Sequence, residues 1–409
     1  MNPTPTQAGP EPLQTRVEFA NQPAPRLASI DAYRGLVMLL MMAEVLAIGK
    51  IAAAIPDSAF WKFLHTQQSH VEWSGMVLHD LIQPSFSFLV GVALPFGLAA
   101  RIKRGQSLGA ILGHAAWRSL LLIALGVWLR SIGRPQTYYT FEDTLSQIGL
   151  GYFFLCLLGM RSVRVQWIAF AVICVGYWAA FALHPLPGAD FDWKAAGVPA
   201  DWPDHAQGFA AHWNKNTNLA WDFDRWFLNL FPRVEAFKNN RGGYATLSFI
   251  PTLATMILGL IAGGWLKSDA PQRLNLSRFC IAGVAGLALG LALHWLGVCP
   301  IVKRIWTPSW VLFSGGWCFL FLAAFYAVID VRNLRRWAFP LMVVGMNSIA
   351  AYCIAHLFEK YFIETLNIHF GRIFPYFAPY DPFVRGALVL LIFWLILFWM
   401  YRRKIFLKV

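Results

Sequence analysis

Charged residues are scarce in this sequence. Asp, Glu, Lys and Arg together make up 13% of its 409 residues, while hydrophobic residues make up 57%. A soluble domain of this size carries roughly a quarter charged residues, so the composition excludes that class. Apolar runs of about 20 residues, the length that crosses a bilayer, recur after Gly35. The sequence therefore predicts an integral membrane protein surrounded by lipid.

Cysteine clusters and two common catalytic motifs are also missing. Most of the six cysteines fall inside apolar runs without the spacing of metal ligands, so we expect neither a disulfide framework nor a metal. The chain contains no GxxxxGK or HExxH, so nucleotide hydrolysis and zinc proteolysis have no support. Residues 1–28 are rich in proline and lack the apolar core of a signal peptide. We expect them to form a disordered cytoplasmic tail ahead of a transmembrane domain at 29–409.

The apolar runs predict an all-α, polytopic transmembrane bundle of about ten spans. The spans are expected to start near Gly35, Val77, Leu112, Leu145, Val165, Leu247, Phe279, Trp310, Ala338 and Phe383. Every second connection is short and basic, and so is the C-terminal tail. Because Lys and Arg concentrate in cytoplasmic loops, these connections and both termini are assigned to the cytoplasmic side of a cell inner (plasma) membrane. The basic loops account for most of the net charge of +13, so no nucleic-acid partner is expected.

The remaining connections are longer, aromatic and polar, and this topology places them outside the cell. The longest runs over residues 184–246 and contains five tryptophans. Two interpretations stay open for it. Tryptophan concentrates at membrane interfaces, which favours an interfacial lid. Aromatic faces beside polar side chains also suit sugar rings, which favours a saccharide platform with Asp224 and Arg225 as substrate-binding residues.

Polar side chains gather between His70 and Gly91, directly ahead of an apolar run. Polar groups at a membrane boundary need a reason. Neutral imidazole can act as a base or a nucleophile near pH 7, so His70 is the first catalytic candidate and His79 the second. Asp80, at the mouth of the second span, would orient a histidine or bind a cationic amine. A plain helix N-terminal carboxylate explains Asp80 equally well.

The pattern His70-x-x-Trp73-x-Gly75, followed by Asp80-Leu-x-x-Pro-x-Phe-x-Phe-x-x-Gly91, resembles the signature of the heparan-α-glucosaminide N-acetyltransferase family. Further segments resemble the family in the same order: Ser29–Gly35, Leu145–Gly149, Arg241–Pro251, Pro300–Trp310 and Gly345–Ile349. The resemblance implies a multi-pass enzyme that takes acetyl from acetyl-CoA on one side and places it on an amino sugar on the other. It implies that His70 is the catalytic histidine. A bacterial-type member without the lumenal domain of the lysosomal enzyme is expected.

Two arginines are candidates to bind acetyl-CoA from the cytoplasm. Arg34 and Arg118, each expected near the inner end of a span, would meet phosphate oxygens, because guanidinium groups suit phosphate. Anchoring arginines that snorkel to the interface are the alternative. Asp31 stands three residues before Arg34 and would pair with it.

Four further residues are candidates for substrate binding. Glu44 is expected within the first span, where an unpaired carboxylate is costly. Trp73 belongs to the motif around His70. Asn347 and His356 are expected in the ninth span, although hydrogen bonding between helices explains Asn347 at least as well.

The favoured function is a membrane acetyltransferase that uses acetyl-CoA as co-substrate, needs no metal and acts on an exterior amino sugar or related glycan. His70 would serve as base or hold the acetyl group in transit, and the sequence leaves both open. The alternative is a secondary transporter of a small polar or sugar-like solute, in which Glu44, Asp80 and the histidines would form a substrate or proton path. A third, weaker interpretation is an assembly partner without activity. A homo-oligomer stays open.

Overall fold

The computed structural model describes residues 27–199 and 201–407, and every regular element within them is a helix. The long helices are α2 (Ala28–Met42), α5 (Ile82–Lys103), α6 (Leu108–Ser131), α7 (Thr144–Gly159), α8 (Val163–Ala182), α10 (Phe249–Lys267), α11 (Gln272–Trp295), α12 (Pro308–Phe325), α14 (Ser348–Phe370) and α15 (Asp381–Arg402). The shorter α-helices are α3 (Ile48–Ala54), α4 (Ala59–Gln68), α9 (Leu219–Phe227) and α13 (Phe339–Gly345). Short 3-10 or π turns are η1 (Ala43–Leu46), η2 (Leu78–Leu81), η3 (Gly208–Trp213), η4 (Leu228–Leu230), η5 (Thr246–Ser248), η6 (Tyr326–Val331), η7 (Arg336–Ala338) and η8 (Phe374–Phe377).

The all-α architecture expected from the sequence is confirmed. The expected N-terminal tail falls outside the described residues as far as residue 26. Helix α2 begins at Ala28, and the division between tail and transmembrane domain stays a prediction.

Seven of the described helices are long and apolar enough to cross a membrane, or up to nine if each of two bent pairs is one span. The fourth expected span is the 16-residue helix α7, which is shorter than the others. The first and ninth are not single straight helices. A bend of 44° separates α2–η1 from α3 at Ala47, whose φ is +50°, and a bend of 67° separates α13 from α14. A count of ten spans and the side of the termini stay predictions.

Helix α10 forms the centre of the bundle and packs against α5, α7, α8 and α12. Close approach between α10 and α5 depends on small residues. A Cβ added to Gly259 would lie 1.9 Å from the carbonyl oxygen of Phe88, and one added to Gly91 would lie 2.0 Å from that of Met256. The two backbones are therefore in direct contact, as is common where helices pack within a membrane. This contact fixes the position of α5, and the polar residues described below lie in the loop and the η2 turn directly before it.

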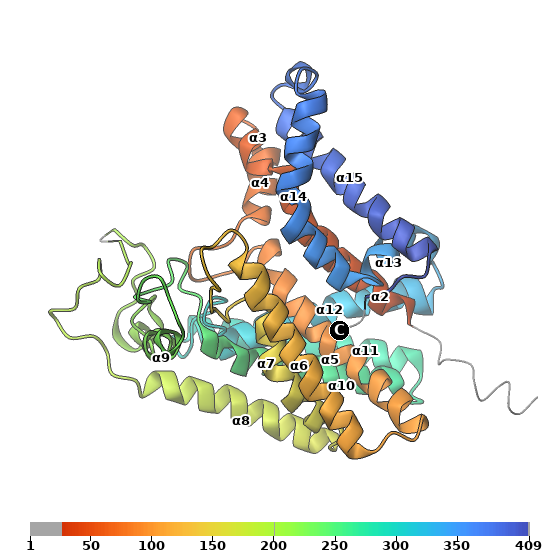
Figure 1. The fold of residues 1–409 in the computed structure, drawn as a ribbon. Coiled ribbons are helices and arrows are strands. Elements are labelled where there is room, and N and C mark those ends of the chain that lie inside the picture. The colour runs from red at the N-terminus through yellow and green to blue at the C-terminus, as the bar shows by residue number, and fades with distance from the viewer. Residues whose placement is uncertain (1–26, 200, 408–409) are drawn as a thin grey trace, which may run out of the picture.

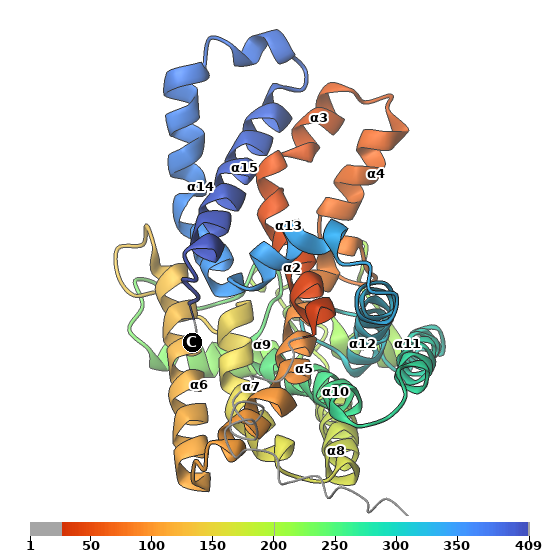
Figure 2. The same ribbon diagram turned by 90° about the vertical axis from the view of Figure 1, so that its right-hand side faces the viewer.

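Two helical hairpins, α3–α4 and α14–α15, project from one end of the bundle (Figures 1 and 2). Helix α15 packs against η1 and α3, so the hairpins support each other. Gly386 of α15 makes close contact with the carbonyl of Val45 in η1, where any side chain would collide. This contact holds the chain at the point where the first span breaks.

The connections at 70–77, 184–246 and 297–307 pack together into a cap beside these hairpins. Trp73, Trp213 and Val302 belong to one buried cluster with Tyr177 and Phe181 of α8. The indole of Trp73 donates to the carbonyl of Trp213 at 3.0 Å, and the Tyr177 hydroxyl donates to a backbone carbonyl in the 297–307 connection at 2.9 Å. The cap is therefore an ordered structure, and it presents His70 to the bundle.

Candidate active site

A cavity of about 920 Å³ is lined by the end of α2, the start of α5, the middle of α14 and parts of the cap. One wall carries Glu44, His70, His79 and Lys303. The end of α6, the start of α7 and one face of α14 contribute further lining residues: Arg130, Glu142, Asp143, Tyr352, His356 and Glu359. The cavity thus brings together polar residues from six separate segments of the chain.

His70, Asp80 and Lys303 form a hydrogen-bonded cluster on the first wall. Asp80 Oδ1 lies 2.7 Å from Nδ1 of His70 and 3.0 Å from Nζ of Lys303. The Asp80 side chain is 1% exposed, that of Lys303 is 6% exposed and that of His70 is 39% exposed. Two buried charges are therefore paired with each other, and the imidazole beside them reaches the cavity.

Backbone groups complete the coordination of the Asp80 carboxylate. Its Oδ2 accepts from the amides of Val77 at 3.2 Å and Val71 at 3.4 Å. A buried carboxylate with this many donors is held ionised and in one orientation. The short η2 turn, which ends where α5 begins, supplies the geometry, because it places Asp80 back over the preceding loop.

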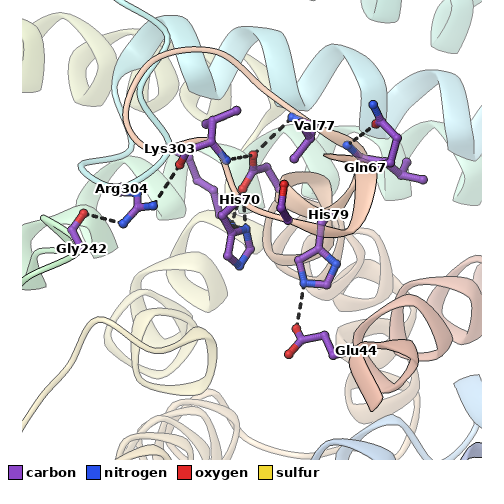
Figure 3. A network of polar contacts seen from close by, with 12 residues as sticks. Glu44, Gln67, His70, Val77, His79, Gly242, Lys303 and Arg304 are labelled. Carbon is purple, nitrogen blue, oxygen red and sulfur yellow. Dashed lines mark hydrogen bonds and ion pairs between the residues drawn. The ribbon is translucent and has the colours of Figure 1, made fainter. Parts of the chain in front are cut away.

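Lys303 reaches this cluster because the 297–307 connection runs against the 70–77 loop. Ser74 and Val302 form an isolated antiparallel bridge, and the amide of Gly75 donates to the carbonyl of Ile301 at 3.0 Å. Arg304 then joins three segments, since its guanidinium donates to the carbonyls of Val71 at 2.9 Å and Gly242 at 2.7 Å (Figure 3).

The hydrogen bonds of His70 define which of its nitrogens can react. Nδ1 lies 2.7 Å from Asp80 Oδ1 and 3.3 Å from Nζ of Lys303. The shorter contact, to the carboxylate, assigns the proton to Nδ1, which donates to Asp80. The lone pair is then on Nε2. Burial lowers the pKa of His70 below its usual value, and the charge of Lys303 acts in the same direction, while the bond to Asp80 opposes both. The ring is therefore neutral at pH 7 and can accept a proton or attack a carbonyl carbon.

A second histidine–carboxylate pair lies beside the first. Nε2 of His79 lies 2.8 Å from Oε1 of Glu44, and the ring centroids of His70 and His79 are 4.8 Å apart (Figure 3). Glu44 belongs to η1, just before the break at Ala47. The expected position of Glu44 in the middle of the first helix is corrected, because Glu44 lies in the η1 turn at the break, where it pairs with His79.

The lining residues from α6, α7 and α14 are joined by fewer hydrogen bonds. Burial raises the pKa of Glu142, and the positive charge of Arg130 opposes the increase. His356 is placed in the cavity as expected, and its Nδ1 contacts the carbonyl of Tyr352 at 2.9 Å. These residues therefore offer both cationic and acidic groups to a ligand.

The residues expected to bind the cofactor lie elsewhere. Arg34 and Asp31 are paired at 3.3 Å, as their spacing predicts. Arg118 donates to the Tyr152 hydroxyl at 3.1 Å and lies over its ring. It sits near the middle of α6, so the expected position at the inner end of a span is wrong. None of the three lines the cavity.

Four residues expected to bind substrate also lie outside the cavity lining. Trp73 is buried in the cap. The amide of Asn347 bonds Ile405 and Leu407 of the C-terminal segment, and Asn347 precedes α14 at the bend instead of lying deep in a helix. Asp224 is buried in the cap and accepts from the amide of Thr246 at 2.9 Å, while Arg225 lies over Trp221 near the surface. Roles for these residues stay predictions.

Lys303 is the residue of this site that sequence reasoning did not select. The lysine was visible inside the Pro300–Trp310 segment, but nothing local indicates a partner 223 residues away. Among the described residues, no group of three or more His, Cys, Asp or Glu side chains is placed to hold a metal ion.

The helices and their apolar faces define this chain as a multi-pass membrane protein with a polar cavity. No family model matches it. It is 26% identical to "Heparan-alpha-glucosaminide N-acetyltransferase" of Homo sapiens over 423 residues, covering 94% of this chain, and 25% identical to the Mus musculus protein of the same name over 445 residues, covering 99%. The chain spans 60% and 64% of the length of these relatives. The family-level relationship to heparan-α-glucosaminide N-acetyltransferases that the motifs suggested is therefore confirmed.

Proposed function

We propose that the chain is a membrane acetyltransferase that moves acetyl from acetyl-CoA to the amine of an exterior amino sugar or related glycan, with the reaction at His70. The observation that carries the proposal is the His70–Asp80 pair, whose free Nε2 belongs to a side chain that lines the cavity. The names of the two relatives support the same reaction class.

In this proposal Asp80 fixes the tautomer of His70 and stabilises positive charge that develops on the ring. The same division of roles operates in Ser-His-Asp triads. Lys303 balances the carboxylate, so that the pair does not hold His70 permanently protonated. Nε2 then acts on the thioester or on the acceptor amine.

The cavity has features that suit the two substrates. Met38 and Met41 extend its lining from Glu44 along α2, and Phe86 does so along α5, which provides an apolar path for an uncharged thioester arm. Arg130 and Lys360 place cations at the same cavity, close to where the acceptor would bind. On the predicted topology the cavity belongs to the exterior half of the bundle, within reach of an exterior acceptor.

The test is CoA release from acetyl-CoA by purified protein, followed by chromatography with a panel of amino sugars. General base or nucleophilic help is worth about 10² to 10⁴ in rate, so His70→Ala should lower release at least 100-fold. His369→Ala, at an exposed histidine outside the cavity, is the matched control and should keep full activity.

Two results would count against the acetyltransferase. The first is that wild-type protein releases no CoA with any acceptor. The second is that His70→Ala protein releases CoA at the wild-type rate. Sugar uptake into proteoliposomes without consumption of acetyl-CoA would support the transporter alternative instead.

A further inference from the structure

We propose that the two histidines divide the reaction: His70 takes the acetyl group from the thioester, and His79, held by Glu44, takes the proton from the acceptor amine. The inference rests on the acetyltransferase function proposed above. It assigns to His79 and Glu44 a step that neither the motif around His70 nor the names of the relatives describe.

The geometry provides two separate acid–base pairs at one cavity. His79 and Asp80 are neighbours in the η2 turn but have different partners. Asp80 pairs with His70, and His79 points toward Glu44 (Figure 3). The two pairs share no carboxylate. Each imidazole therefore has its own orienting group and can change protonation state without releasing the other.

His70 cannot take the amine proton while it carries the acetyl group. Its Nδ1 proton is engaged by Asp80, and once Nε2 carries an acetyl group the ring has no lone pair with which to accept a proton. Transfer to an amine then needs a second base nearby. His79 is the closest histidine, with its ring centroid 4.8 Å from that of His70.

Other groups at the cavity fit this role less well. Lys303 is an ammonium paired with Asp80, and it has no lone pair while charged. His356 comes from α14, and its Nδ1 contacts the carbonyl of Tyr352 in its own helix. Glu44 is itself close, but its Oε1 is occupied by Nε2 of His79, which makes it a positioning residue.

The proposed reaction has two steps and restores the protonation state of both histidines. Nε2 of His70 attacks the thioester carbonyl carbon, the C–S bond breaks, and CoA leaves as a thiolate from an acetyl-imidazolium that faces the Asp80 carboxylate. The unprotonated amine then attacks the same carbon and the C–N bond to His70 breaks. The amine proton passes to Nδ1 of His79, whose Nε2 proton stays on the bond to Glu44. Transfer of one proton from His79 to the thiolate restores both histidines and yields CoA and the amide.

The experiment separates the two half-reactions with radiolabelled acetyl-CoA. His79→Gln should still give a burst of CoA and labelled protein, because His70 is intact, but its transfer of label to glucosamine should fall about 10² to 10⁴-fold. Hydroxylamine is largely unprotonated at neutral pH and gives up a proton readily after it attacks, so it depends less on a base. It should accept the label from His79→Gln protein at close to the wild-type rate.

Glu44→Gln keeps a hydrogen-bond acceptor for His79 without the charge, and it should slow transfer alone by a smaller factor. His369→Gln is the matched control. The inference is overturned if His79→Gln transfers label to glucosamine at the wild-type rate, or if both variants lose the two half-reactions equally. Absence of any CoA burst from wild-type protein would instead overturn the acetyltransferase function, so the two failures are distinguishable.

Discussion

Replacement of Lys303 by methionine tests the central cluster of the site. The substitution keeps the length and apolar stem of the side chain and removes the ammonium group that lies 3.0 Å from Asp80. Asp80 is 1% exposed, so water cannot replace the lost cation. The carboxylate would keep only His70 and two backbone amides as partners.

The expected loss of stability follows from the distance and the burial. At an effective dielectric constant of about 20, two unit charges 3.0 Å apart attract by about 5–6 kcal/mol. Desolvation offsets part of this, and removal of one partner from a buried ion pair typically costs about 3–5 kcal/mol. The double variant Asp80→Asn with Lys303→Met should be more stable than Lys303→Met alone, because no charge is then left buried without its partner.

Thermal unfolding in detergent would measure both variants against wild type. Lys360→Met, at a lysine whose side chain is 88% exposed, is the control and should melt within about 0.5 kcal/mol of wild type. The explanation fails if Lys303→Met has the melting temperature of wild type. It also fails if the double variant has a lower melting temperature than Lys303→Met alone. Lys303→Met should also raise the pKa of His70, because the lysine charge now lowers it. The acid limb of the activity profile should therefore move to higher pH.

Three further outcomes follow from the structure. Asp80→Asn should lower kcat by at least about 10²-fold, since loss of the carboxylate in a triad costs about 10⁴ through the wrong tautomer, and an unchanged kcat would refute the orienting role. Burial raises the pKa of Asp224 to about 7, above the value near 3.9 in the unfolded chain, so stability should fall as pH rises from about 4 to 7. Thermal melts of Asp224→Asn should show a weaker dependence of stability on pH. Gly259→Ala should destabilise the contact between α5 and α10 by about 1–3 kcal/mol or more, whereas Gly264→Ala, with open space around it, should not; equal melting of the two would contradict the close packing.

The positions of the helices could be predicted well from the sequence. Each expected span start lies within several residues of a helix, because a bilayer-length apolar run leaves the backbone little alternative to a helix. The two breaks could not be predicted. The bend at Ala47 accompanies the packing of Gly386 against Val45, a contact between the first and last spans that leaves no local signal.

The site was predictable in part for a similar reason. His70 and Asp80 stand ten residues apart within one motif, so their association was visible. Glu44 and His79 are 35 residues apart, and Lys303 and Asp80 are 223 apart, so these contacts exist only because helices and loops fold onto one another. Trp73 shows the converse, since its place in the motif suggested a ligand contact while the structure uses it to hold the cap together.

The most direct test is a single-turnover measurement in which purified wild-type or His70→Ala protein is in excess over radiolabelled acetyl-CoA, with glucosamine present as the acceptor. The account predicts that wild-type protein forms labelled N-acetylglucosamine in one turnover, and that His70→Ala forms it at least about 100-fold more slowly. Formation of the labelled sugar at equal rates by both proteins would contradict a reaction centre at His70.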